Sequence, residues 1–274
     1  MRTLKSIFDF YLDACIHVAL AVISLAGVTF YLLDASFDPS LLGFIFFGVI
    51  VCYNFVKYGV EAHKYLIVSN AYHKVIQIFS FLAFGFAVYF LLRLDTDLWV
   101  VIGVMTLLSA LYAVPMLPST KNLRNLGGFK IYIVALVWVG FTVIMPAMDA
   151  NLPLDWDIWV LSLQRFIFVV VLILPFEIRD LQWDDISLRT LPQVFGVEKT
   201  KGIGMVLTVI LFFLTFLRDR VHQSEILLRL ILCGMLIFGL LSSRRIQSRY
   251  FVSFWVEAIP IIWVGLFWVA KNYF

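Results

Sequence analysis

Charged residues are scarce in this sequence. They make up 14% of its 274 positions, whereas a typical soluble domain has about 25%. Hydrophobic residues account for 62%, and the mean hydropathy is +0.97. This composition excludes a water-soluble globular domain. We therefore expect a polytopic membrane protein that contacts membrane lipids and has no nucleic-acid partner.

Cysteine and histidine are also few, and neither forms a motif. The three cysteines lie far apart in apolar segments, which argues against a disulfide framework or a zinc site. The four histidines show no metal-ligand spacing. No linker or low-complexity tract divides the chain, so we expect one transmembrane helical domain over residues 1–274. We expect no cleavable signal peptide, because Asp9 and Asp13 precede the first apolar run.

Long apolar runs are the main feature that is present. There are about nine of them, each close to the ~20 residues that a helix needs to cross a bilayer. Their approximate limits are 14–33, 40–57, 74–93, 97–115, 129–148, 157–176, 203–218, 225–241 and 251–270. The loops between them are short. The sequence therefore predicts an all-α fold, a polytopic bundle of about nine transmembrane helices.

Basic residues are distributed unevenly between the loops. If the N-terminus is cytoplasmic, the inner segments hold fifteen Lys and Arg residues and the outer segments hold four. The outer segments are instead rich in Asp. This asymmetry agrees with the positive-inside rule. We expect a multi-pass protein of a bacterial inner (plasma) membrane, with a cytoplasmic N-terminus and the C-terminus outside.

Four carboxylates stand close together directly after the sixth apolar run. They are Glu177, Asp180, Asp184 and Asp185. On a helix, Glu177, Asp180 and Asp184 fall at i, i+3 and i+7 and share a face, where they would repel one another. A divalent cation would remove that repulsion, and oxygen ligands suit Mg²⁺. We expect this cluster to bind Mg²⁺.

Two further polar groups are predicted at the same membrane face. The residues in question are Asn54, Lys57 and Glu61 after the second run, and Tyr112, Lys121, Arg124 and Lys130 after the fourth. Carboxylates beside an amide suggest a metal site, and Lys and Arg suggest a phosphate site. Together they predict Mg²⁺-assisted binding of a diphosphate whose apolar tail lies between the helices. The 27 Phe, 11 Tyr and 8 Trp could line a cavity that shields an allylic cation.

These motifs resemble a known family, the UbiA superfamily of intramembrane prenyltransferases. Its second aspartate-rich motif is similar to Asp180-x-x-x-Asp184-Asp185 followed by Thr190-Leu191-Pro192 and Gly196. Its segment around spans four and five is similar to Tyr112-x-x-Pro115, Arg124, Lys130, Trp138 and Pro146. The resemblance covers nearly the whole chain. It implies nine spans, Mg²⁺, a prenyl diphosphate substrate and a lipid-soluble acceptor.

The resemblance also assigns roles to residues. Asp180 and Asp184 would be the catalytic metal ligands, supported by Glu177 or Asp185. The metal side would be completed by Asn54 and Glu61. The phosphate oxygens would be bound by Tyr112, Arg124 and Lys130, which match the family pattern. Lys57 and Lys121 are further phosphate-binding candidates because they are basic residues predicted at the same membrane face.

One motif of the family is altered in this chain. The family's first motif reads Asn-x-x-x-Asp-x-x-x-Asp; Asn54 matches it, but Tyr58 and Ala62 occupy the Asp positions. Glu61 is one residue short of the second position, which rotates it by about 100° on a helix. A second metal would lose its main ligands. The site would then work with one metal and a base such as Lys57, or it would have lost its chemistry.

Two hypotheses about function therefore stay open. The first is a Mg²⁺-dependent prenyltransferase or, within the same class, a terpene cyclase. The second is a catalytically inactive membrane subunit or lipid-binding scaffold with a membrane protein partner. A transporter is a weaker third hypothesis, because nothing suggests inverted repeats.

Individual residues also have structural interpretations. The acidic cluster could pair with neighbouring bases such as Arg179, and Asn54 could form an interhelical hydrogen bond. Arg165 and Glu257 lie inside apolar runs, where a charge is costly. We favour a structural ion pair or snorkelling for each of them, and we do not expect them to pair with each other.

Overall fold

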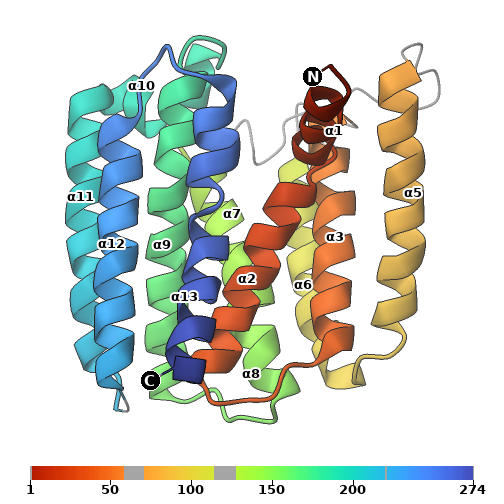
Figure 1. Cartoon of the computed structure of the whole chain (residues 1–274), viewed down its shortest axis with the longest axis vertical. Coiled ribbons are helices and arrows are strands. Elements are labelled where there is room, and N and C mark those ends of the chain that lie inside the picture. The colour runs from red at the N-terminus through yellow and green to blue at the C-terminus, as the bar shows by residue number, and fades with distance from the viewer. Residues whose placement is uncertain (1, 59–70, 114–127, 220, 274) are drawn as a thin grey trace.

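The computed structural model describes residues 2–58, 71–113, 128–219 and 221–273, and these form helices and no strand. Figure 1 shows the helices standing side by side. Their bounds are α1 (Arg2–Asp13), α2 (Ile16–Leu32), α3 (Pro39–Tyr58), α5 (Ala71–Leu91), α6 (Thr96–Ala113), α7 (Lys130–Val139), η2 (Gly140–Ile144), α8 (Met145–Asp149), α9 (Trp156–Asp180), η3 (Ile186–Leu188), α10 (Leu191–Phe195), α11 (Val197–Phe213), η4 (Leu214–Leu217), α12 (Gln223–Ser242), η5 (Phe251–Val256) and α13 (Ile259–Tyr273).

The helices confirm the predicted spans. Within the described residues, eight helices are long and apolar enough to cross a membrane, and there are nine if the bent pair α1 and α2 counts as one span. Some spans combine elements: α7, η2 and α8 form one, and η5 and α13 form another. In lipid, a helix satisfies all of its backbone hydrogen bonds within one segment, which is why apolar runs of this length become helices. The chain is a multi-pass membrane protein.

The helix α1 was not predicted. It meets α2 at an angle of 57°, and Cys15 lies between them with a φ of 59°. A non-glycine residue in this left-handed region is uncommon, and it ends one helix before the next begins. The charged residues Lys5, Asp9 and Asp13 lie on α1, so this helix is too polar to be recognised as an apolar run.

The core is centred on α9. Buried residues make up 72% of its apolar stretch, compared with 17% for α5 and α6. It packs against α7, α11 and α12, while α2 packs against α3 and α13. A side chain at Gly204 on α11 would collide with Leu240 of α12, so this glycine permits close approach of the two helices. The least buried helices offer their apolar faces to lipid.

The bundle has two ends that differ in composition. We call the motif end the one at which α3 and α9 finish and α1 and α7 begin; it is at the top of Figure 1. The other end of the bundle, at which α9 begins and α13 finishes, is called the opposite end. The predicted functional residues that the structure describes lie at the motif end.

Candidate functional site

The acidic motif begins on the last turn of α9. Asp180 is the final residue of this helix, and Asp184 follows in a turn in which its N–H donates to the carbonyl oxygen of Asp180 at 2.8 Å. The prediction that Glu177, Asp180 and Asp184 share one helix face is therefore wrong for Asp184. Because α9 ends at Asp180, Asp184 lies beyond the helix and does not take the i+7 position on its face.

Asp180 is held by the residue beside it. Arg179 donates from Nε to Oδ1 at 2.7 Å and from Nη2 to Oδ2 at 3.1 Å, which is a bidentate pair. The Nη1 of Arg179 also donates to Ser253 Oγ at 2.9 Å, so this pair joins α9 to η5. The structural alternative, that the acids pair with neighbouring bases, is realised at this residue.

Three other groups meet around the first turn of α7. Lys130 Nζ lies 3.6 Å from Asp184 Oδ2. Glu177 is buried and interacts electrostatically with Lys130, Asp184 and Asp180. Its Oε2 is buried without a hydrogen-bond partner among the residues that the structure describes. Lys130 thus lies beside two carboxylates, those of Asp184 and Glu177, and Asp180 is close to Glu177. Acidic and basic groups meet here, as a mixed metal and phosphate site would require.

Residues 188–193, which follow the acidic turn, link that turn to the start of α7 by hydrogen bonds. Thr190 starts α10, and its N–H donates to Gln193 Oε1 at 2.9 Å, an interaction of the capping-box type. Gln193 Nε2 in turn donates to the carbonyl oxygen of Asp185 at 3.1 Å. The Leu188 carbonyl accepts from the N–H of Gly128 at 2.9 Å, just before α7 begins. The Thr-Leu-Pro sequence therefore has a local structural role in positioning the acidic turn.

The end of α3 is engaged with α1 and α5. Asn54 is buried, and its Nδ2 donates to the Ala14 carbonyl at 3.2 Å and to Ser80 Oγ at 2.9 Å. Tyr58, at the position where the family's first motif has Asp, donates from its hydroxyl to the carbonyl oxygen of Asp13 at 3.1 Å. Asn54 therefore forms the interhelical hydrogen bonds that were its structural alternative.

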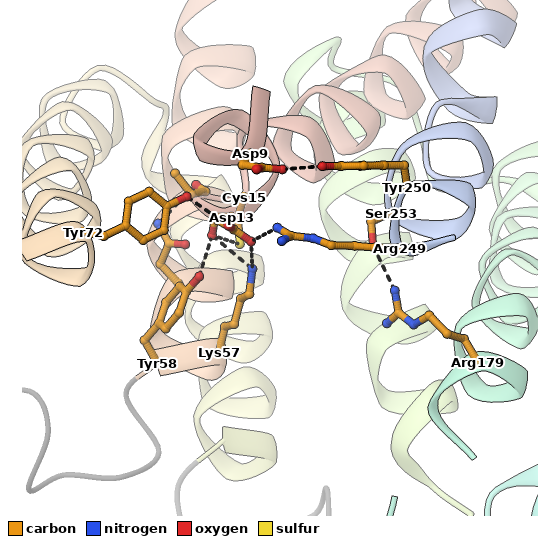
Figure 2. A network of polar contacts seen from close by, with 12 residues as sticks. Asp9, Asp13, Cys15, Lys57, Tyr58, Tyr72, Arg179, Arg249, Tyr250 and Ser253 are labelled. Atoms are coloured by element: carbon orange, nitrogen blue, oxygen red, sulfur yellow. Dashed lines mark hydrogen bonds and ion pairs between the residues drawn. The ribbon is translucent and has the colours of Figure 1, made fainter. Parts of the chain in front are cut away.

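Asp13 is the centre of a network that sequence reasoning missed (Figure 2). Its Oδ1 lies 3.3 Å from Lys57 Nζ and 2.7 Å from Arg249 Nη2, and its Oδ2 accepts from the Tyr72 hydroxyl at 2.9 Å. Burial lowers the pKa of Arg249, but the hydrogen bond and the charge of Asp13 outweigh this and raise it above its usual value. The network joins four segments of the chain, and Lys57 is its one member among those predicted site residues that the structure describes.

The only sequence signal for this network was weak. Asp9 and Asp13 are four residues apart on a helix, and Asp9 accepts from the Tyr250 hydroxyl at 2.8 Å. A pocket of about 360 Å³ opens beside the network and is lined by Lys5, Ser6, Asp9, Asp13, Tyr72 and Arg249. Two carboxylates and two basic groups line it, so it has no net charge that would select an ion.

The remaining predicted residues divide into two groups. Tyr112 is half-buried in the last turn of α6, and Asp185 is exposed beyond α9. Glu61, Lys121 and Arg124 lie outside the described residues. The structure thus brings Glu177, Asp180, Asp184 and Lys130 together. It places Lys57 in the Asp13 network, whereas Asn54 bonds to Ala14 and Ser80.

The carboxylates suit Mg²⁺ in kind, because all their donors are oxygen atoms and one buried oxygen of Glu177 has no partner within the described ranges. They do not form a preformed centre: in that part of the chain, no group of three His, Cys, Asp or Glu side chains is arranged to hold a metal. To bind a metal, the Asp180 carboxylate would have to give up its hydrogen bonds to Arg179. Lys130, which now lies beside Asp184, would also have to contact the anion. The arrangement therefore fits a metal that enters with an anion able to attract these two bases.

The fold is that of UbiA homologues. A UbiA homologue from Archaeoglobus fulgidus bound to DMAPP and Mg²⁺ superposes with a TM-score of 0.62 at 11% identity, covering 97% of this chain and 99% of that one. The structure with GPP and Mg²⁺ gives 0.59 at 11% identity, over 96% and 99%. A structure of digeranylgeranylglyceryl phosphate synthase gives 0.58 at 14% identity, over 98% of each chain. No protein-family model and no curated protein matches the sequence. At such identities the likeness concerns the fold, which is UbiA-like over nearly the whole chain.

Proposed function

We propose that this protein is a Mg²⁺-dependent intramembrane prenyltransferase that transfers a prenyl group from a prenyl diphosphate to a lipid-soluble acceptor. The observation that carries the proposal is the meeting of Lys130 with Glu177 and Asp184 at one end of a UbiA-like bundle. The UbiA homologue from Archaeoglobus fulgidus, which has this fold, was captured with DMAPP and with GPP, each together with Mg²⁺, and this supports the same ligand class here. On this proposal the motif end faces the cytoplasm of a bacterial inner membrane.

The acidic residues would hold the metal. Asp180 and Asp184 would be its main ligands, with Glu177 or Asp185 beside them, and Asn54 and Glu61 on the other side. When bound, Mg²⁺ offsets the negative charge that develops on a leaving diphosphate. Asn54 would contribute only if its amide turned away from Ala14 and Ser80, so we regard it as the weaker member of the set.

The basic residues would hold the phosphate oxygens. Lys130 would exchange Asp184 for a phosphate oxygen, a charge-assisted contact of the same kind. Arg124, Lys121, Lys57 and Tyr112 are the further candidates.

During transfer, the bond between the prenyl C1 and the diphosphate oxygen breaks, the acceptor bonds to C1, and the acceptor releases a proton. Aromatic side chains such as Tyr53 and Trp138, joined by a 2.9 Å hydrogen bond, would stabilise the allylic cation.

A second candidate is a catalytically inactive UbiA-like subunit or lipid-binding scaffold. It is favoured by the bidentate pairing of Asp180 with Arg179 and by Tyr58, whose hydroxyl binds the backbone at Asp13. Such a protein would hold an ordinary phospholipid between its helices, and a membrane protein partner would cover part of its lipid-facing surface. A terpene cyclase would use the same ionisation without an acceptor.

One experiment distinguishes these candidates. The purified protein in nanodiscs would be incubated with Mg²⁺ and labelled prenyl diphosphates of ten to twenty carbons, and both binding and diphosphate release would be measured. We expect Mg²⁺-dependent release that falls by about 10²-fold or more in Asp180→Asn. Asp34→Asn, an exposed change at the opposite end, should match the unmodified protein. No binding and no turnover at any chain length would favour the inactive subunit. Release without an added acceptor, with a cyclic product, would identify a cyclase.

A further inference from the structure

A second charged cluster is buried in the opposite half of the bundle. Arg165 on α9 and Arg229 on α12 are each 2% exposed. Both guanidinium groups face Trp263 of α13, with Cζ at 5.7 Å and 5.0 Å from the centre of the ring. Arg165 is too deeply buried to snorkel, and it forms no ion pair among the residues described. Both structural interpretations of this residue are therefore wrong.

The cluster carries more positive than negative charge. Glu225 pairs with Arg229, at 3.1 Å, and with Arg218. The charged neighbour of Arg165 is Arg229, a second cation. Among the described residues, Glu225 is thus the one carboxylate paired with this group of three guanidinium groups, and it pairs with Arg218 and Arg229 but not with Arg165. The group has an excess of two positive charges. Charges at this depth are costly unless an opposite charge compensates them.

Three hydrogen-bond donors of this cluster also lack acceptors. They are Nη1 of Arg165, Nε of Arg229 and Nε1 of Trp263, and all three are buried without a partner within the described ranges. Another nitrogen of Arg165, Nη2, donates to Thr29 Oγ1 at 3.0 Å. Guanidinium and indole N–H groups can donate but cannot accept, so they cannot satisfy one another. What is missing is an acceptor, and the charge excess requires that it be negative.

We propose that Arg165, Arg229 and Trp263 bind a small monovalent anion of the chloride type in the interior of the bundle. Such an ion supplies the missing acceptor and removes one of the two surplus charges. The three side chains are at most 2% exposed, so the site is enclosed by protein. A lipid phosphate would need an opening to the bilayer, which favours an inorganic ion. The ion would link α9, α12 and α13, and Arg165 extends the link to α2 through Thr29.

This proposal does not depend on the enzymatic one, and it can be tested through stability. The full chain would be unfolded thermally in phosphatidylcholine nanodiscs, in sodium chloride and in sodium gluconate of equal ionic strength. A ligand that binds only the folded state raises the unfolding temperature in a concentration-dependent manner. We expect a saturable rise of several degrees in chloride or bromide. An unchanged unfolding temperature across the chloride series would overturn the proposal.

Three variants refine the test. Arg165→Met should lose the chloride effect and be at least as stable in gluconate as the unmodified protein, because an apolar side chain replaces a surplus charge. Trp263→Phe keeps an aromatic ring but removes the indole N–H donor, so it should raise the half-saturating chloride concentration several-fold. Lys271→Met, an exposed charge at the opposite end, should keep the full effect. A chloride effect that persists undiminished in Arg165→Met would overturn the assignment.

Two further measurements identify the ion and its place. A bromide anomalous signal beside Arg165, Arg229 and Trp263 in the unmodified protein is the expected result, and it needs no variant to fold. Nanodiscs containing phosphatidylglycerol provide a comparison in gluconate. Stabilisation by this lipid in place of chloride, without a bromide signal, would overturn the assignment of a small ion in favour of a phosphate headgroup.

Discussion

The two halves of the bundle neutralise charge in different ways. At the motif end, Asp13 joins Lys57 and Arg249, whose side chains are 44% and 53% exposed. In the opposite half, the cluster of Arg165 and Arg229 is sealed from solvent and has a surplus of positive charge. Ion pairs in contact with water contribute little to folding stability, and their members can change partners at a small free-energy cost. Buried charges, in contrast, destabilise the fold unless an opposite charge compensates them. The exposed pairs of the Asp13 network should therefore contribute little to stability, whereas the buried cluster should contribute strongly.

The largest effect should come from the one carboxylate of the buried cluster. Glu225→Gln would leave Arg218 and Arg229 without their counter-charge, and we expect the free energy of unfolding to fall by about 3–5 kcal/mol. The midpoint of denaturant unfolding in detergent micelles would measure this. Glu198→Gln, which removes an exposed carboxylate 3.8 Å from Lys201, serves as the control and should change stability by less than about 1 kcal/mol. Equal effects of the two substitutions would show that the buried cluster has no special role.

An intermediate effect is expected at the basic residue of the acidic motif. Lys130→Met should weaken binding of a non-hydrolysable geranyl diphosphate analogue by about 10- to 100-fold in the presence of Mg²⁺, because a charge-assisted hydrogen bond is lost. Calorimetric titration would measure the affinity. Lys201→Met is the matched control, since Lys201 Nζ donates to the Leu241 carbonyl at 3.1 Å and has no place in the proposed site. Unchanged affinity in Lys130→Met would separate Lys130 from the phosphate site.

The smallest effect should come from the Asp13 network. Asp13→Asn keeps the shape of the side chain but weakens its pairs with Lys57 and Arg249, so we expect a loss of about 1 kcal/mol or less. The loss should be confined to α1, whose amides would exchange hydrogen faster while those of α2 stay protected. High salt should reduce the difference between the two proteins, because it screens the pairs that remain exposed. A global loss of protection would mean that Asp13 supports the whole bundle.

Much of the fold could be predicted because its signal is local. Each of the nine apolar runs became a helix, since a backbone surrounded by lipid must satisfy its own hydrogen bonds. The motif from Glu177 to Gly196 could also be located, because its turn and the Thr190 cap are made by residues close in sequence. The helix α1 could not, because Asp9 and Asp13 make it polar and their partners lie far along the chain.

The partners of the charged residues could not be predicted for the same reason. Asp13 and Arg249 are 236 positions apart, and no periodicity in the sequence connects them. Arg165 was expected to pair or to snorkel, yet it meets Arg229 and Trp263, each from another helix. Asp180 pairs with the adjacent Arg179, which was one of several basic residues near it in the sequence.

The order of apolar and polar residues along the chain was enough to predict about nine membrane-spanning helices and to locate the acidic motif between Glu177 and Gly196. Burial, mutual distance and partner choice emerged from the packing of the helices. Hydropathy acts residue by residue and favours a helix wherever lipid surrounds the backbone. The energy of a charge depends instead on which groups other helices bring within a few ångströms of it, and that information is not contained in any single segment.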